Sequence, residues 1–330
     1  MKTIDIVLPV YNEEAGIREF HRALMEVIDQ QRDRYAFHLI YVLDRCTDRT
    51  FDILRDLARA CPIMDVVQLS SRFGHQMSLI AGLDRSSGDA LIMMDADLQH
   101  PPALIPSLLA KFEEGYDVVQ TVRHYSQQTS WFKRRASGLF YAMQNALSPV
   151  EIKDGMADFR LLSRRVVRVF QTDIREQNQF LRGLFRWVGF RRAEVEFKSG
   201  ERPRGVTKYQ LLRLLTFSAT GIVSFSKLPL RIATLVGFAT TIAGMAYAVF
   251  LMIDYLSLGG FPRGYPSLIL VVLILGGLQL VFLGVIGEYI GAIFDEVKHR
   301  PLYVVEEVVE GLPRSAEGVT SRGRASGAGS

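Results

Sequence analysis

Two long stretches near the C-terminus contain no charged residue, and they constrain the fold more than any other feature of this sequence. The first runs from Ile232 to Ile253 and the second from Gly264 to Gly287. Each is long enough to cross a bilayer as a helix, which takes about 20 apolar residues. A single run could be the core helix of a soluble domain. Two runs joined by a short Gly- and Pro-rich link, residues 258–266, instead predict a membrane hairpin.

Basic residues cluster beside both stretches, whereas the link carries little charge. They are Arg213, Lys227 and Arg231 before the first stretch, Lys298 and Arg300 after the second, with only Arg263 and Asp254 around the link. Because segments rich in Lys and Arg stay on the cytoplasmic side, this pattern predicts a multi-pass protein in a lipid bilayer whose flanks and N-terminal domain face the cytoplasm. The formal net charge of +4 is too small to indicate a nucleic-acid partner.

The first 200 residues alternate between strand and helix patterns, with charges throughout. Short apolar runs predict strands at 4–10, 38–43, 64–69 and 90–94. Helical spacing of apolar residues predicts helices at 13–31, 50–60 and 77–83. This alternation indicates an α/β fold with a doubly wound, mostly parallel sheet, whose ligands bind at the carboxyl ends of the strands.

Two phosphate-binding motifs of α/β proteins are absent from the sequence. No Gly-x-Gly-x-x-Gly follows the first strand, and no Gly-x-x-x-x-Gly-Lys-Ser/Thr occurs anywhere. The first turn, Pro9-Val-Tyr-Asn-Glu-Glu14, offers no glycine-rich backbone loop for a phosphate. A diphosphate bound here would therefore need a cation to neutralise its charge.

Asp95 and Asp97 follow the fourth predicted strand and are candidates for that cation site. If the chain stays extended, side chains two residues apart point the same way, so the carboxylates would lie side by side. Hard oxygen ligands of this kind suit Mg²⁺ or Mn²⁺, and Gln99 can add a carbonyl oxygen. The alternative is a solvated acidic turn ahead of Pro101-Pro102, and the spacing alone leaves both open.

Five motifs occur in a fixed order along the chain. They are Val7-Leu-Pro-Val-Tyr-Asn-Glu-Glu14, Asp44 to Asp48, Met94-Asp-Ala-Asp-Leu-Gln-His-Pro-Pro102, Asp158-Phe-Arg160 and Arg202-x-x-Gly-x-Thr-Lys-Tyr209. Together with the hairpin they resemble the polyprenyl-phosphate glycosyltransferases of inverting family 2, which includes the dolichol-phosphate mannose synthases. The bacterial members that glucosylate undecaprenyl phosphate also carry a two-helix membrane hairpin.

The resemblance implies an organisation and an activity. The expected parts are a GT-A-like nucleotide-sugar domain at 1–207, an interfacial region at 208–230, two transmembrane helices within 231–295 and a partly disordered cytoplasmic tail at 296–330. The implied reaction transfers a sugar from a nucleotide diphosphate sugar, a UDP-sugar, to a polyprenyl phosphate such as undecaprenyl phosphate. It would proceed with inversion and with Mg²⁺ or Mn²⁺ as cofactor. The resemblance also implies that the active site is on the cytoplasmic face of a bacterial inner membrane.

The resemblance also assigns residues around the donor. It places Pro9, Tyr11, Glu13, Asp44 and Asp95 at the nucleotide, with Asp44 at the base, and Asp95, Asp97 and Gln99 at the metal and diphosphate. One motif departs from the family pattern: Leu43-Asp-Arg-Cys-Thr-Asp48 stands where Asp-Asp-Gly-Ser-x-Asp is usual, so the base is not specified. An alternative role for Glu13 is to favour the dipole of the following helix.

Basic residues and one further carboxylate are expected near the acceptor. Arg123, Arg202 and Lys208 can supply positive charge to the phosphates, and the resemblance makes 202–209 a loop that closes over the diphosphate. Contact with anionic headgroups is the alternative. The resemblance places Asp158 near the acceptor as a catalytic base. Because a phosphate monoester, with its second pKa about 6, is already a nucleophile near neutral pH, the alternative is that Asp158 orients the acceptor or holds Arg160.

Three further expectations concern the membrane and rival functions. Apolar residues within 208–230 predict an interfacial helix, with a core helix as the alternative. Gly284, Gly287 and Gly291 would allow a homo-oligomer through the membrane helices. A processive polysaccharide synthase would carry Gln-x-x-Arg-Trp, where this chain has Gln179-Phe-Leu-Arg-Gly183. A non-catalytic membrane scaffold is the remaining alternative.

Overall fold

The computed structural model describes residues 1–97, 99–124, 156–177, 179–198, 228–258 and 264–311. Contacts divide the chain into two units. The first contains Met1–Val119, Asp158–Gln171 and the chain from Tyr303, and the second contains Gln120–Ala157 and Thr172–Leu302.

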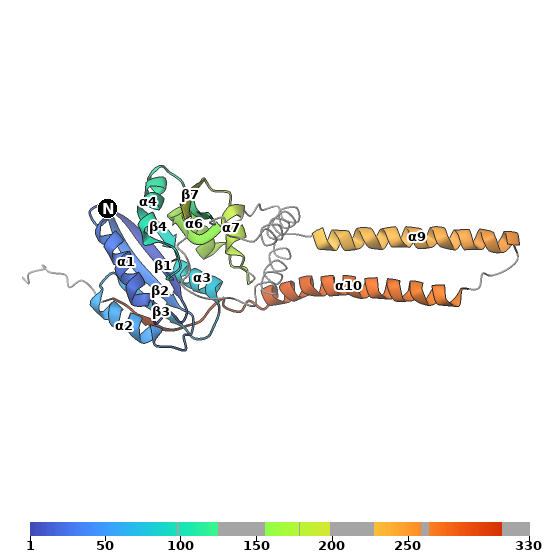
Figure 1. The fold of residues 1–330 in the computed structure, drawn as a ribbon, viewed down its shortest axis with the longest axis horizontal. Helices are drawn as coiled ribbons and strands as arrows, with labels where there is room; N and C mark the ends of the chain where they lie inside the picture. The colour runs from blue at the N-terminus through green and yellow to red at the C-terminus, as the bar shows by residue number, and fades with distance from the viewer. Residues whose placement is uncertain (98, 125–155, 178, 199–227, 259–263, 312–330) are drawn as a thin grey trace, which may run out of the picture. The chain divides into compact units, whose positions relative to one another are not determined.

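A mostly parallel sheet forms the centre of the first unit (Figure 1). Its parallel strands are β1 (Lys2–Val10), β2 (Tyr35–Leu43), β3 (Met64–Leu69) and β4 (Ala90–Met93). Antiparallel strands lie on either side of this group: β6 (Met156–Ser163) pairs with β4, and β8 (Val305–Val309) pairs with β3. With β5 (Val118–His124) and β7 (Arg192–Lys198), the strand order is β7-β5-β6-β4-β1-β2-β3-β8.

The predicted doubly wound fold is confirmed. From Ile4 to Val10, β1 is buried at every residue, as a parallel strand covered on both faces must be. β2 begins at Tyr35, three residues before the predicted start, because Tyr35 and Phe37 are buried while Ala36 between them is exposed. Such alternation marks a strand with one solvated face.

Three helices follow the strands in the predicted order: α1 (Ile17–Asp29), α2 (Thr50–Ala60) and α3 (His75–Arg85). Three more helices of the first unit were not predicted: η1 (Pro102–Leu104), α4 (Ile105–Glu113) and α6 (Arg164–Thr172). The bounds of α2 match the prediction, α1 is shorter than predicted, and α3 begins two residues earlier than expected. This earlier start places His75 on the first turn of α3.

α3 approaches β1 closely because a glycine removes the side chain at their contact. A Cβ atom on Gly82 would lie 2.3 Å from Cγ1 and 2.8 Å from Cγ2 of Val7. Any side chain at this position would therefore push the helix away from the strand. The close packing brings the N-terminal end of α3 to the carboxyl end of β1, where the ligands of such sheets bind.

The second unit contains α7 (Leu181–Trp187) and two long apolar helices, α9 (Leu228–Leu258) and α10 (Tyr265–Val297). Within them lie two candidate membrane spans, Pro229–Phe250 and Ile274–Val297, whose residues are not buried by other parts of the protein. These are the two helices that the hairpin prediction requires, and the described part of the chain supports no further pass.

The chain after α10 returns to the first unit as β8. The sequence analysis placed these residues in a tail, since five residues give too short a pattern to predict a strand. Ser70 donates its N–H to Val304 O at 2.9 Å, and Tyr303 donates its hydroxyl to Asp84 at 2.7 Å. Residues 208–227 of the expected interfacial helix and 312–330 of the expected tail lie outside the described residues.

Candidate active site

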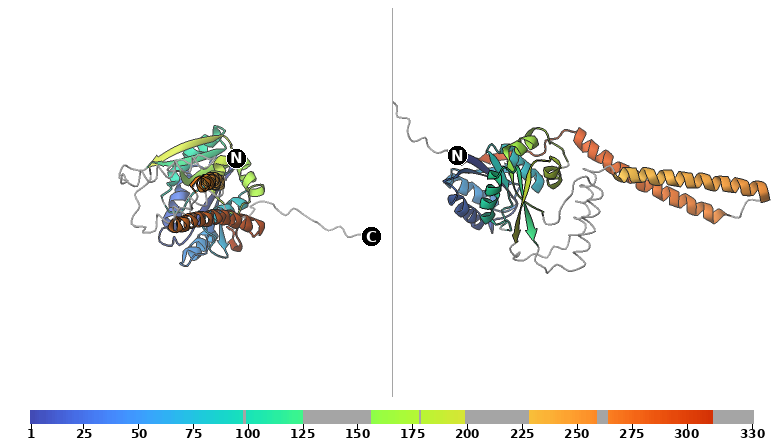
Figure 2. Two further views of the ribbon diagram at one scale, coloured as in Figure 1. Left: turned by 90° about the vertical axis from the view of Figure 1, so that its right-hand side faces the viewer. Right: turned by 90° about the horizontal axis from the view of Figure 1, so that it is seen from above.

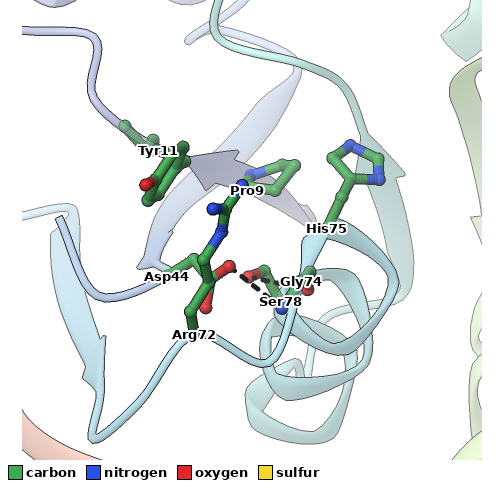
Figure 3. A pocket seen from close by; sticks show the side chains of 8 residues that line it. Pro9, Tyr11, Asp44, Arg72, Gly74, His75 and Ser78 are labelled. Carbon is green, nitrogen blue, oxygen red and sulfur yellow. Dashed lines mark hydrogen bonds between the residues drawn. The ribbon is translucent and has the colours of Figure 1, made fainter. Parts of the chain in front are cut away.

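A small pocket opens where β1 and β2 end and α3 begins (Figure 3). Its volume is about 150 Å³, and its lining is Pro9, Val10, Tyr11, Asp44, Arg72, Gly74, His75 and Ser78. Three of the residues predicted at the nucleotide, Pro9, Tyr11 and Asp44, therefore share one pocket. They come together because the carboxyl ends of neighbouring parallel strands meet at the same edge of the sheet.

Asp44 is buried and holds the loop that leads into α3. Its carboxylate accepts the backbone N–H of Phe73 at 2.7 Å and that of Gly74 at 2.9 Å. Gly74 has a φ of +91°, a conformation that favours glycine. The predicted contact of Asp44 with a base stays a prediction, whereas its bonds to this loop shape the pocket wall.

Arg72 is a pocket residue that the sequence analysis missed. Its guanidinium carbon lies 4.3 Å from the centre of the Tyr11 ring, within the range of a cation–π contact. Figure 3 shows Arg72 extending from the loop after β3 toward the Tyr11 ring. Its position in the loop after a predicted strand could have indicated a binding role. Only the fold, however, brings that loop to Tyr11 in the turn after β1.

The segment from Asp95 to His100 bends directly after β4. The strand ends at Met93, and the chain is no longer extended at Asp97, whose carboxylate accepts the N–H of Gln99 at 3.0 Å. Such a side-chain bond to the backbone two residues on favours a turn over an extended chain. The conditional expectation of an extended Asp95–Asp97 segment is therefore not met.

Two histidines contact Asp95, and neither was predicted. His75 Nε2 lies 2.7 Å from Asp95 Oδ1, and His100 Nδ1 lies 3.0 Å from Asp95 N and 3.5 Å from Asp95 Oδ2. The side chain of His75 is 42% exposed and that of His100 is 4% exposed. His100 lies inside the motif from Met94 to Pro102, so its nearness to Asp95 in the sequence could have indicated a role at the site. No sequence pattern links His75 to Asp95.

Glu13 lies in a strongly negative part of the site. Burial raises its pKa, and the charges of Asp97, Asp48 and Asp95 raise it further. The first turn and the segment after β4 therefore bring carboxylates close enough to repel one another. Within the described residues, no three His, Cys, Asp or Glu side chains are already arranged to hold a metal ion.

Asp158 forms a buried ion pair with Arg160 on β6. The Asp158 Oδ1 to Arg160 Nη2 distance is 2.7 Å, and both side chains are almost fully buried. Arg160 is paired with Met93 in the register between β6 and β4, so this ion pair lies on the strand beside the Asp95 segment. The alternative in which Asp158 holds Arg160 thus has a direct contact in its favour.

Arg123 is not among the residues that line the pocket. Arg123 lies on β5, in the second unit, with its guanidinium carbon 5.9 Å from the centre of the Phe197 ring. Its Nε is buried without a hydrogen-bond partner. Arg202 and Lys208 lie outside the described residues. Their predicted roles at the phosphates stay predictions.

Comparisons with known proteins place this site in a family. The model for glycosyl transferase family 2 matches residues 5–170, and that for the GtrB C-terminal hairpin matches residues 228–293. An uncharacterised glycosyltransferase of Bacillus subtilis is 40% identical over 302 residues, which cover 92% of this chain and 93% of that protein. The SfII prophage-derived bactoprenol glucosyl transferase of Shigella flexneri is 37% identical and covers 94% and 99%.

Among solved structures, the chain is similar to glucosyl-3-phosphoglycerate synthase from Mycobacterium tuberculosis in complex with Mn²⁺, UDP-glucose and phosphoglyceric acid. The two share 21% sequence identity with a TM-score of 0.45, over 67% of this chain and 78% of that one. The family models and the two bacterial relatives are the stronger matches, and they show that this chain belongs to glycosyltransferase family 2.

Proposed function

We propose that this protein transfers a sugar from a UDP-linked donor to a polyprenyl phosphate such as undecaprenyl phosphate, with inversion. The observation that carries the proposal is the presence, in one chain, of a carboxylate cluster at the strand ends of a family 2 domain and of two apolar helices able to span a membrane. Relatives that match the chain along almost its whole length are named bactoprenol glucosyl transferase, which supports the lipid acceptor.

The nucleotide is proposed to bind in the pocket at the ends of β1 and β2. The flat ring of Tyr11 and the guanidinium of Arg72 offer stacking surfaces for a base. Asp44 keeps the loop before α3 in place through its bonds to Phe73 and Gly74. These residues bind and orient the donor without taking part in bond breaking.

Asp95, Asp97 and Gln99 would hold the Mg²⁺ or Mn²⁺, which would neutralise charge on the departing diphosphate. Their oxygen atoms are the donors that these ions prefer. Glu13 supports the fit: besides burial, which contributes most, the negative charges of Asp97, Asp48 and Asp95 raise its pKa, and a divalent cation would offset these charges. The same charges would repel a diphosphate that arrived without a cation.

The acceptor phosphate is proposed to act as the nucleophile itself. One of its oxygens forms a bond to the anomeric carbon while the bond from that carbon to the diphosphate oxygen breaks, and the electron pair leaves with the nucleoside diphosphate. With a second pKa of about 6, the phosphate carries the needed charge at neutral pH. Asp158 is then assigned to hold Arg160, and Arg123, Arg202 and Lys208 to balance phosphate charge.

Two membrane crossings are proposed to keep the catalytic unit on the cytoplasmic face of a bacterial inner membrane. The chain enters α9 and leaves α10 beside basic residues, which favours the cytoplasmic side for both ends of the hairpin. β8 follows α10 and pairs with β3, so the catalytic sheet contains strands from before α9 and from after α10 in the sequence. The chain before α9 and the chain after α10 would then have to lie on the same side of the membrane.

A donor panel with undecaprenyl phosphate tests the proposal. Purified full-length protein in detergent is given each nucleotide sugar with Mg²⁺, with Mn²⁺ or with a chelator, and the lipid is analysed by mass spectrometry. We expect a single added sugar with a UDP-linked donor, dependent on the metal. A ladder of added sugars would indicate a processive synthase, and no donor consumption under any condition would indicate a scaffold.

A pair of variants links the activity to the site. Asp95→Asn removes one proposed metal ligand, and we expect at least a 100-fold loss of sugar transfer, since removal of a key charged group at such a site typically costs several kcal/mol. Asp29→Asn is the matched control because Asp29 is an exposed residue that pairs with Arg32 at the end of α1. Equal activity of the two variants would refute the assignment.

A further inference from the structure

His100 is buried at the end of the segment that carries the proposed metal ligands. Its side chain is 4% exposed, and its Nδ1 lies 3.0 Å from the backbone nitrogen of Asp95. The backbone N–H donates, so Nδ1 accepts, and a neutral ring then carries its proton on Nε2. This bond holds the main chain of Asp95, whereas the contact of His75 is to the Asp95 carboxylate.

The bond closes a loop around Asp97. His100 is five positions after Asp95 in the sequence, and between them Asp97 accepts the N–H of Gln99. Two side-chain bonds to backbone N–H groups therefore constrain this segment, and the bond between Gln99 and Asp97 lies within the span closed by Asp95 and His100. Only the bond of His100 reaches back to the residue where the segment leaves β4.

The ring of His100 is anchored to the sheet. It packs on the ring of Phe159, with centroids 5.5 Å apart, and Phe159 is fully buried on β6. β6 pairs with β4, which ends at Met93, two residues before Asp95. The ring therefore links the Asp95 backbone to the core of the sheet and restrains it more than a surface turn would be restrained.

We propose that His100 is a positioning residue that holds Asp95 in place through the hydrogen bond at Nδ1. The consequence for metal binding rests on the proposed function, whereas the hold on the Asp95 backbone does not. Groups that orient a metal ligand typically change metal affinity or activity by about 10- to 100-fold when removed. A bond to the ligand's own main chain should act in the same way.

Two amide variants distinguish the atom that matters. The side-chain oxygen of Asn reaches approximately the place of Nδ1, whereas the amide of Gln extends toward the place of Nε2. His100→Asn should therefore keep an acceptor for the Asp95 N–H, and His100→Gln should lose it. His299→Asn is the matched control, because His299 is exposed and has a φ of +47°, which Asn tolerates.

Hydrogen exchange of the peptide covering residues 93–97, measured by mass spectrometry on the full-length protein, tests the hold directly. Besides the amide of Met94, which bonds to Val7 O, we expect one slowly exchanging amide, that of Asp95, in the wild type, in His100→Asn and in His299→Asn, and its loss in His100→Gln. Fast exchange in the wild type, or equal protection in both His100 variants, would overturn the proposal, as would loss of protection in both.

Binding of Mn²⁺ in the presence of UDP, followed by electron paramagnetic resonance, tests the consequence. The dissociation constant should rise about 10-fold or more in His100→Gln and stay within about 3-fold of the wild type in His100→Asn. If the exchange data are as expected but the wild type transfers no sugar, the proposed function is refuted and the hold of His100 on the Asp95 backbone stands. Unchanged Mn²⁺ binding in His100→Gln despite lost amide protection would overturn the positioning role.

Discussion

His38 provides a pH-dependent contribution to stability whose size can be worked out from the structure. Its Nδ1 lies 3.7 Å from Asp5 Oδ1, and its Nε2 lies 3.2 Å from Asp65 Oδ2. Asp5 is fully buried and also accepts the N–H groups of Ser87 and Gly88. The two carboxylates, Asp5 first and then Asp65, raise the pKa of His38 from 6.5 to about 9.

The sign of the effect follows from this raised pKa. The folded protein holds the proton on His38 more tightly than the unfolded chain does, so the contribution is fully present below pH 6.5. It is lost as the pH rises toward 9. A change from 6.5 to about 9 corresponds to at most about 3.4 kcal/mol. Because 34% of the side chain is exposed, solvent screening reduces the expected value to about 1 to 2 kcal/mol.

Thermal unfolding of wild type and His38→Gln between pH 6 and pH 10 tests this reasoning. The wild type should lose roughly 2 to 8 °C more than the variant across the window from pH 6.5 to 9.5. His21→Gln is the control: burial lowers the pKa of His21, so its effect falls below pH 6.5 and leaves this window unchanged. A parallel pH dependence of wild type and His38→Gln would refute the assignment of the proton to His38.

Three further predictions concern the pocket and its supports. Gly82→Ala should lower the free energy of unfolding by about 1 to 3 kcal/mol through its clash with Val7, and adding Val7→Ala should restore part of it; a stable single variant in chemical denaturation would contradict the contact. Arg72→Ala should raise the KM for the nucleotide sugar several-fold with little change in kcat, since it removes a surface beside Tyr11; steady-state kinetics with an unchanged KM would exclude Arg72 from donor binding. Asp158→Asn should destabilise the protein by about 3 kcal/mol because it leaves a buried arginine without its carboxylate; normal thermal stability would contradict this, and a full loss of turnover with normal stability would restore Asp158 as a catalytic base.

Local patterns in the sequence were enough to predict the four parallel strands, the first three helices, the two long apolar helices and the family. The alternation of apolar runs with helical spacing gives the parallel strands and the doubly wound order, because burial on both faces demands a continuous apolar strand. The two uncharged stretches that begin at Ile232 and Gly264 correspond to α9 and α10, which are long and apolar enough to be candidate membrane spans. Asp95, Asp97 and Asp158 were found through motifs that need no knowledge of packing.

Only the tertiary structure brought distant residues to these motifs. His75 reaches Asp95 across 20 residues because Gly82 lets α3 pack closely on β1. β8, which follows α10 in the sequence, pairs with β3. Periodicity determines which face of an element is buried, but it does not specify which element lies against that face. The contacts of Asp95 with His75 and His100 therefore became visible only in the tertiary structure. The carboxylates of Asp95 and Asp97, in contrast, were evident from the sequence.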